Sequence, residues 1–190
     1  GYNPDVYKYC AGYQYADNTI VGFSHTHMNG TGHSDLGDFL IMPTVGKLRF
    51  NPGTKENPDG GYRSRFSHAT EKAKPGYYAV KLDDYNIDAE LSASERVGYH
   101  KYKFPKSIDA HIILDMTAGI YNYDGKVVWS SVRVENNNLV TGFRQTNGWA
   151  RTRYVYFAME FSKPIKTYQL RNDEQSVYGG FWRKFNQNNN

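Results

Sequence analysis

The feature that most constrains this chain is a series of short strand-like segments, spaced roughly ten residues apart. In residues 76–82 and 87–93 apolar and polar residues alternate, and a period of two places the apolar side chains on one face of an extended strand, so both predict half-buried β-strands. Further predicted strands are residues 98–104, 110–116, 127–135, 138–146 and 153–161. Their spacing favours an all-β fold, an antiparallel β-sandwich with few helices, whose middle part runs as a meander.

The composition agrees with such a fold. Aromatic residues make up 16% of the chain, 17 of them tyrosine, and aromatic side chains are favoured in strands. Turn-forming residues fill positions 83–86, 122–125 and 135–138, where tight antiparallel connections are expected. A length of 190 residues suits one all-β domain, so we expect a single sandwich domain over residues 1–190.

Charge and apolar content exclude several classes of partner. The formal net charge is +4 and the basic residues are scattered, so no nucleic acid is implied. No apolar run reaches the length of a membrane span. Cys10 is the sole cysteine, which excludes an internal disulfide. The chain begins without an initiator Met or signal peptide, and we expect it to be a piece of a longer protein.

A polar loop at residues 25–38 is the first candidate site. His25 and His27 are two residues apart, so on an extended segment both side chains point to the same face, as two groups that hold one ion or one sugar must. With His33 and Asp35 they could form a zinc site, although no metal motif accompanies them. They could also hydrogen-bond one another within the loop. Contacts with sugar hydroxyls are the interpretation that we favour.

Tyrosines precede this loop at alternate positions. Tyr7, Tyr9, Tyr13 and Tyr15 share one face if their segment is extended. An aromatic face can stack against the C–H side of a sugar, and it can equally form a buried face of a sandwich. The sequence leaves both interpretations open.

Carboxylate pairs for glycoside hydrolysis can be drawn from Asp35 with Asp38, or from the group Asp83, Asp84 and Asp88. The second group falls in a predicted turn, where Asp commonly serves turn geometry and solvation. Arg96 could grip a hydroxyl, or pair with Glu90 or Glu95.

Several blocks of the sequence, in order, resemble the amino-terminal domain of glycoside hydrolase family 92, the bacterial exo-α-mannosidases. The first block is Gly22-Phe23-Ser24-His25-Thr26-His27, which continues to residue 32. The likeness goes on through residues 35–38, 41–43, 66–71, 75–78, 89–94 and 96–105, and more loosely through the later strands.

The resemblance implies a β-supersandwich of the galactose-mutarotase-like kind, packed in the parent enzyme against an (α/α)6 catalytic barrel. Hydrolysis in that family is calcium-dependent and inverting, and it removes mannose from glycans, including N-glycans. The barrel supplies the catalytic carboxylates and the calcium ligands, and nothing in this sequence resembles it. We therefore expect no catalytic and no metal-binding residue in this chain, and an inactive isolated fragment.

By the same resemblance, this chain lends substrate-binding groups to a mannose pocket of the α-1,2-mannosidase type. The matching positions are Tyr7, Tyr9, His25, Thr26 and His27, and Arg96 is a further candidate. The implied partners are a mannose-containing glycan and the enzyme's own catalytic domain. The implied location is secreted, in the periplasm or on the bacterial cell surface.

Three other functions fit the same residues. The chain could be a stand-alone carbohydrate-binding module without catalytic activity, with the tyrosine face and the histidine loop as a shallow site. It could be a metal hydrolase that uses the cluster at residues 25–38. It could also be only a structural companion for the barrel, with its polar loop at an interdomain interface.

Overall fold

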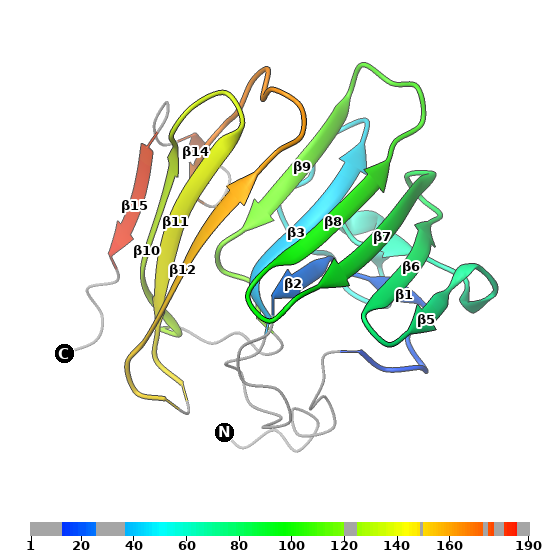
Figure 1. The fold of residues 1–190 in the computed structure, drawn as a ribbon, viewed down its shortest axis with the longest axis horizontal. Coiled ribbons are helices and arrows are strands. Elements are labelled where there is room, and N and C mark those ends of the chain that lie inside the picture. The colour runs from blue at the N-terminus through cyan, green and yellow to red at the C-terminus, as the bar shows by residue number, and fades with distance from the viewer. Residues whose placement is uncertain are drawn as a thin grey trace. The chain divides into compact units, whose positions relative to one another are not determined.

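The computed structural model describes residues 13–25, 37–119, 125–148, 150–172, 175–176 and 181–185, and from residue 172 onward it places the backbone alone. By their contacts these residues form two compact units (Figure 1). The first consists of Tyr13–His25 and Phe39–Asp115, and the second of Gly37, Asp38 and the described residues from Met116 onward. The helices within the described ranges are three-residue 3₁₀ turns, and none is long and apolar enough to cross a membrane.

The first unit contains three antiparallel sheets, with strand orders β1-β4, β2-β3-β9 and β5-β6-β7-β8. The 3₁₀ turns η2 (Pro58–Gly60) and η3 (His68–Thr70) lie in its connections. Its strands are β1 (Thr19–Ile20), β2 (Phe23–His25), β3 (Asp38–Val45), β4 (Ser64–Arg65), β5 (Lys72–Lys74), β6 (Tyr77–Leu82), β7 (Ile87–Ala93), β8 (Gly98–Lys103) and β9 (Ala110–Asp115).

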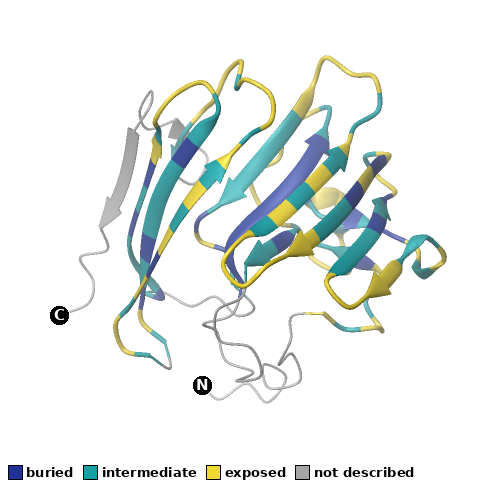
Figure 2. Cartoon of the chain, in the orientation of Figure 1, coloured by how far each residue is buried: buried dark blue, intermediate teal, exposed yellow. Residues whose placement is uncertain are grey.

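The second unit is built on a four-stranded antiparallel sheet of order β12-β11-β10-β15, with a small β13-β14 pair. Its strands are β10 (Val127–Val134), β11 (Leu139–Thr146), β12 (Arg153–Glu160), β13 (Arg171–Asn172), β14 (Gln175–Ser176) and β15 (Phe181–Phe185). One face of this sheet carries the buried Val132, Val140 and Val155, and the residues between them along each strand are more exposed (Figure 2).

The strands predicted from the sequence are confirmed as antiparallel strands. The predicted strand 87–93 has the bounds of β7, and the others agree with β6 and β8 to β12 within one residue. Alternation identifies a strand that has one inner and one outer face. In β7, for example, Ile87 and Ala89 are buried while Asp88 between them is exposed.

The meander expected through the middle of the chain is wrong at one strand. After β8 the chain passes Pro105 and β9 pairs with β3, with Leu40 opposite Asp115 and Val45 opposite Ala110. The reason lies in β3, which is buried at every position from Asp38 to Thr44 (Figure 2). A strand with no solvent-exposed face needs neighbours on both edges, and β2 and β9 occupy them.

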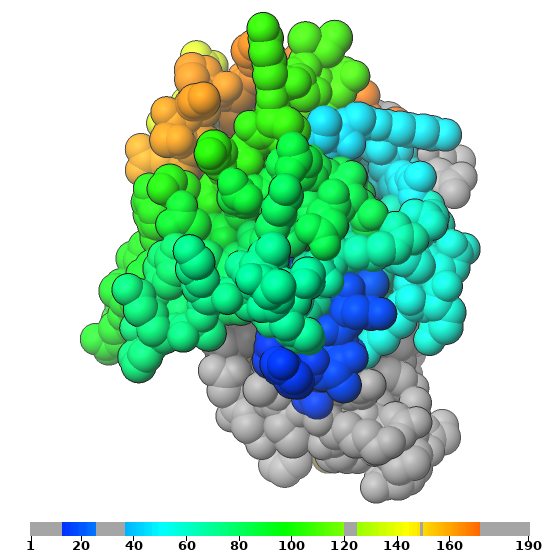
Figure 3. All heavy atoms as spheres, turned by 90° about the vertical axis from the view of Figure 1, so that its right-hand side faces the viewer, coloured from blue at the N-terminus to red at the C-terminus, as the bar shows by residue number. Residues whose placement is uncertain are grey.

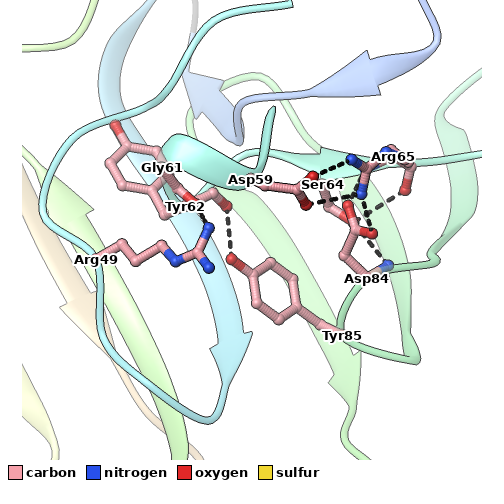
Figure 4. A network of polar contacts seen from close by, with 8 residues as sticks. All are labelled: Arg49, Asp59, Gly61, Tyr62, Ser64, Arg65, Asp84 and Tyr85. Atoms are coloured by element: carbon pink, nitrogen blue, oxygen red, sulfur yellow. Dashed lines mark hydrogen bonds and ion pairs between the residues drawn. The ribbon is translucent and has the colours of Figure 1, made fainter. Parts of the chain in front are cut away.

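The segment 51–63 connects β3 to β4 as a loop that contains η2, and its end is buried. Tyr62 is 1% exposed and donates a hydrogen bond of 2.6 Å from its hydroxyl to Asp115. The returning chain is held by Arg65, whose guanidinium pairs with Asp59 at 2.7 Å and with Asp84 at 2.8 Å, while the Tyr85 hydroxyl donates to the Tyr62 carbonyl (Figure 4).

Asp38 forms an ion cluster with two arginines, in which Asp38 and Arg144 are fully buried and the Arg153 side chain is 11% exposed. Arg144 donates from Nε to Asp38 Oδ1 at 2.9 Å, and Arg153 donates from Nη1 to Asp38 Oδ2 at 2.7 Å. The Nη1 of Arg144 also donates to the carbonyls of Met116 and Ala118 at 3.1 and 2.7 Å. A carboxylate without solvent exposure is tolerated because both of its oxygens accept charge-assisted hydrogen bonds.

Removing this carboxylate should destabilise the fold strongly. Asp38→Ala leaves two guanidinium groups without their anion in a site that excludes water, and we expect a loss of about 3–5 kcal/mol in the free energy of unfolding. Urea unfolding followed by tryptophan fluorescence measures it. The control is Asp83→Ala, the same change at an exposed turn position, which should cost less than about 0.5 kcal/mol. Equal losses in the two variants would contradict the assignment.

Candidate functional site

His25 ends β2, and it is the one residue of the predicted histidine pair that the structure describes. Its side chain faces His100 on β8, with 3.2 Å between the two Nε2 atoms. The rings are stacked, with centroids 5.1 Å apart and planes 16° apart. Phe23, two residues earlier on the same face of β2, stacks on Tyr102 of β8 in the same way. The sheets β2-β3-β9 and β5-β6-β7-β8 therefore meet through these four rings.

A glycine makes room for the His25 ring. Gly98 begins β8, and a Cβ atom added there would lie 2.3 Å from Cε1 of His25. No real Cβ approaches a ring so closely, so any other residue at this position would displace the imidazole. The sequence alone could not reveal this role, because Gly98 and His25 are far apart along the chain.

His100 connects His25 to a buried tyrosine. Its Nδ1 lies 2.7 Å from the hydroxyl of Tyr102. Burial, with a smaller contribution from the charge of His25, lowers the pKa of His100 to about 4, and burial raises the pKa of Tyr102 above its usual value. At neutral pH both partners are therefore uncharged. His100 then has one N–H and one lone pair to share between Tyr102 and His25.

This chain of hydrogen bonds couples the proton on His25 to the orientation of the Tyr102 hydroxyl. If Tyr102 donates to His100, then Nε2–H of His100 donates to His25, and the proton of a neutral His25 resides on its Nδ1. If Tyr102 accepts, Nε2 of His25 carries the proton and its Nδ1 presents a lone pair. Either way, the pair presents His25 as a fixed polar group at the end of β2.

The remaining predicted site residues are only partly visible. Tyr7, Tyr9, Thr26 and His27 lie outside the described residues. Arg96 lies in the turn between β7 and β8, just before Gly98, and its side chain is exposed. Glu90, one of its suggested partners, instead accepts hydrogen bonds from Lys101 and Tyr77, both at 2.8 Å.

Two of the candidate carboxylates for hydrolysis make structural contacts. Asp38 is enclosed by its two arginines. Asp84 accepts a hydrogen bond of 2.7 Å from the amide of Arg65, 19 residues earlier in the chain, whereas Asp83 and Asp88 are exposed. Asp35 and His33 lie outside the described ranges. Among the residues that the structure does place, no three His, Cys, Asp or Glu side chains converge on a point where a metal ion could sit.

A second polar cluster was missed by reasoning from the sequence. Glu71 contacts His68 Nδ1 and accepts hydrogen bonds from the hydroxyls of Tyr78 at 2.5 Å and Tyr13 at 3.3 Å. Burial alone would raise the pKa of Glu71, but the hydrogen bonds from Tyr78 and His68 outweigh it and lower the pKa. Tyr15 stacks on His68 with ring centroids 4.3 Å apart.

These contacts hold the segment that contains Tyr13 and Tyr15 against η3 and β6, and Figure 3 shows residues 13–25 in blue beside the green strands. Tyr15 is part of a turn, so the extended tyrosine face is not formed at this end of the series. The signal for the cluster was the spacing of His68 and Glu71, since residues i and i+3 of a helical turn share a face.

Comparison with known proteins gives concordant results. The model of the family described as Glycosyl hydrolase family 92 N-terminal domain matches residues 2–190. The structure of a family GH92 α-mannosidase from Bacteroides thetaiotaomicron, in complex with mannoimidazole, superposes with a TM-score of 0.85 and 38% identity, covering 94% of this chain and 24% of that chain.

Two further relatives are more distant. The gh92 family glycosyl hydrolase ccman5 has a TM-score of 0.73 and 26% identity, with 90% of this chain and 24% of that chain covered. An uncharacterized secreted glycosidase from Arthroderma benhamiae is 31% identical over 101 residues, which are 50% of this chain and 12% of the relative. The chain thus spans about a quarter of the length of its structural relatives.

The neutral His100 should make stability depend on pH. In the unfolded chain His100 takes up a proton below its ordinary pKa of 6.5, whereas in the folded chain it does so only near 4. Lowering the pH from 6.5 to 4 therefore favours unfolding, by about 2 kcal/mol at this partly exposed site. Urea unfolding of the chain and of His100→Gln across this range should show a weaker pH dependence in the variant.

The matched control for that experiment is His111→Gln. His111 is also half-buried, and it hydrogen-bonds the Gly46 carbonyl at 3.1 Å. It should leave the pH dependence close to that of the original chain. The interpretation fails if His100→Gln and the original chain lose stability in parallel as the pH falls.

Proposed function

Because this chain belongs to the glycosyl hydrolase family 92 N-terminal domain family, we propose that it positions substrate in a secreted, calcium-dependent, inverting exo-α-mannosidase. Its substrates are mannose-containing glycans, including N-glycans, with terminal α-1,2-linked mannose. The observation that carries the proposal is the 38% identity, over 94% of the chain, to an α-mannosidase whose structure holds mannoimidazole. Secretion is supported by the secreted glycosidase among the relatives.

The reaction in this proposal is a single displacement. A general acid protonates the leaving glycosidic oxygen while a base removes a proton from water, and the water oxygen attacks the anomeric carbon from the opposite face. Both carboxylates belong to the catalytic domain of the parent protein. Of the described carboxylates, Asp38 and Glu71 are enclosed by their hydrogen-bond donors, so neither is proposed for either role.

Calcium is likewise assigned to the catalytic domain. A calcium site needs six or more oxygen ligands, several of them carboxylate. Among the residues placed by the structure, Asp38 is neutralised by two arginines, which would repel a cation, and no group of three acidic or histidine ligands converges. The described residues therefore do not fit calcium, and none of them acts through it in the proposed reaction.

The role of this chain is to bind and orient the sugar. His25 is held by its contact with the uncharged His100, so its imidazole meets a sugar hydroxyl in a fixed orientation. A group whose orientation is fixed in advance loses little entropy when substrate binds, and such positioning can contribute several kcal/mol to catalysis. Further contacts with the sugar are proposed for Thr26, His27, Tyr7, Tyr9 and Arg96.

Activity measurements on two lengths of the protein test this role. We expect hydrolysis of α-mannobiose by the protein of natural length and none by the 190-residue chain, with activity lost on chelation and restored by calcium. In the longer protein, His25→Ala should lower kcat/KM by about 10- to 100-fold, which corresponds to about 1.4–2.8 kcal/mol of transition-state stabilisation.

The control is His111→Ala in the longer protein, because His111 contacts the Gly46 carbonyl within the first unit and has no place in the proposed site. It should keep kcat/KM. A purely structural companion domain makes the opposite prediction, namely that His25→Ala lowers the melting temperature and leaves kcat/KM intact. Hydrolysis by the short chain itself would also overturn the proposal, since the carboxylates would then have to lie within it.

A further inference from the structure

The outer face of the sheet β10-β11-β12 carries an unusual set of exposed aromatic residues. Along β12, Tyr154 and Tyr156 are 46% and 70% exposed, while Val155 between them is buried. Phe143 on β11 lies opposite Tyr156, and Trp129 on β10 lies opposite Gln145, the next outward residue of β11. The rings thus belong to neighbouring strands of one sheet face, which places them side by side.

The rings form a contiguous aromatic cluster across the three strands. Tyr154 and Tyr156 are nearly parallel, with 16° between their planes and 6.5 Å between their centroids. The ring centroids of Phe143 and Tyr156 are 5.4 Å apart. Trp129 packs edge-on against Phe143, with 5.2 Å between their centroids. Because the inner rings support the outer ones, the exposed Tyr156 is held in place before any ligand arrives.

Polar groups border the platform on one side. A shallow hollow of about 360 Å³ lies over the strands. Its outward-facing lining residues are Ser131, Arg133, Glu135, Thr141, Phe143 and Tyr156. Thr141 donates its hydroxyl to Glu135 at 2.6 Å, which orients the carboxylate. An aromatic surface beside a few convergent donors and acceptors is the usual composition of a small-molecule site.

We propose that this face, the β10–β12 platform, is a binding site for a neutral oligosaccharide. One pyranose ring stacks its C–H side on Tyr156, and its hydroxyls hydrogen-bond to Glu135, Thr141 and Arg133 at the border. Tyr154, with its parallel ring, carries the next sugar along the chain. The platform uses none of the residues around His25, and the proposal rests on the proposed function only for the choice of mannose as the sugar.

The chemistry of the face argues against other occupants. The hollow has a carboxylate beside its guanidinium, so it offers no net positive charge to an anionic ligand. Glu135 and Ser131 line this hollow, and both residue types are typically depleted in the core of a protein interface. A sugar uses both the ring face and the polar border.

Affinity electrophoresis through gels with soluble α-mannan, or with a soluble α-glucan for comparison, tests the proposal on the protein of natural length. We expect α-mannan to retard the protein, and Tyr156→Ala to weaken binding at least tenfold. Tyr156→Phe keeps the ring and should retain most of the retardation. Tyr99→Ala is the matched control, because Tyr99 is 64% exposed on β8 and lies outside the platform, and it should bind as the unchanged protein does.

Circular dichroism and thermal unfolding of each variant exclude loss of fold as the cause. Retardation by either polysaccharide that depends on Tyr156 supports the site, and α-glucan preference would change only the sugar. Absence of retardation, or equal retardation of Tyr156→Ala and the unchanged protein, overturns it. The hydrolysis assays on His25 give a separate readout, so failure of the platform and failure of the proposed mannosidase role are distinguishable.

Discussion

The interaction on which the rest of the structure depends is the enclosure of the Asp38 carboxylate by Arg144 and Arg153. Asp38 is the first residue of β3, and the chain reaches it through Gly37 at φ 87 and leaves it through Phe39 at φ 51. A positive φ at a bulky residue costs roughly 1–2 kcal/mol, so it persists only where stronger contacts impose it. Both charged oxygens of Asp38 are satisfied in this conformation, and the ion cluster is the contact that imposes it.

The position of β3 determines where the side chains of its neighbouring strands lie. β3 is the central strand between β2 and β9, and it is buried along nearly its whole length. β2 ends at His25, so the position of this imidazole follows from its pairing with β3 and from the space that Gly98 leaves on β8. The β3 backbone and Gly98 thus fix the His25 side chain, although neither belongs to the proposed sugar contacts. Rigid scaffolds position functional groups in this way.

The local sequence pattern was sufficient to predict most of the strands. It was insufficient to predict the contacts between segments that are distant in the sequence. The alternation at β7 and β11 follows from one buried face per strand, and a period of two reads that directly. β3 was recognisable only as an apolar segment, because a strand buried on both faces does not alternate. The pairing of β3 with β9, of Asp38 with Arg144, and of His25 with His100 joins residues that are 65 or more positions apart. No periodicity encodes such partners, although the resemblance to a known family did indicate that His25 matters.

The tyrosines have different roles that depend on whether their side chains are buried or exposed. Tyr62, Tyr78 and Tyr102 are held at polar partners, and burial is the largest cause that raises the pKa of each, so they remain protonated and serve as fixed hydrogen-bond groups. Tyr154 and Tyr156 face outward, where a ring contributes its flat surface. Here the two rings lie nearly parallel, and Phe143 packs against Tyr156. Such cross-strand packing stabilises the sheet and restricts the Tyr156 ring at the same time.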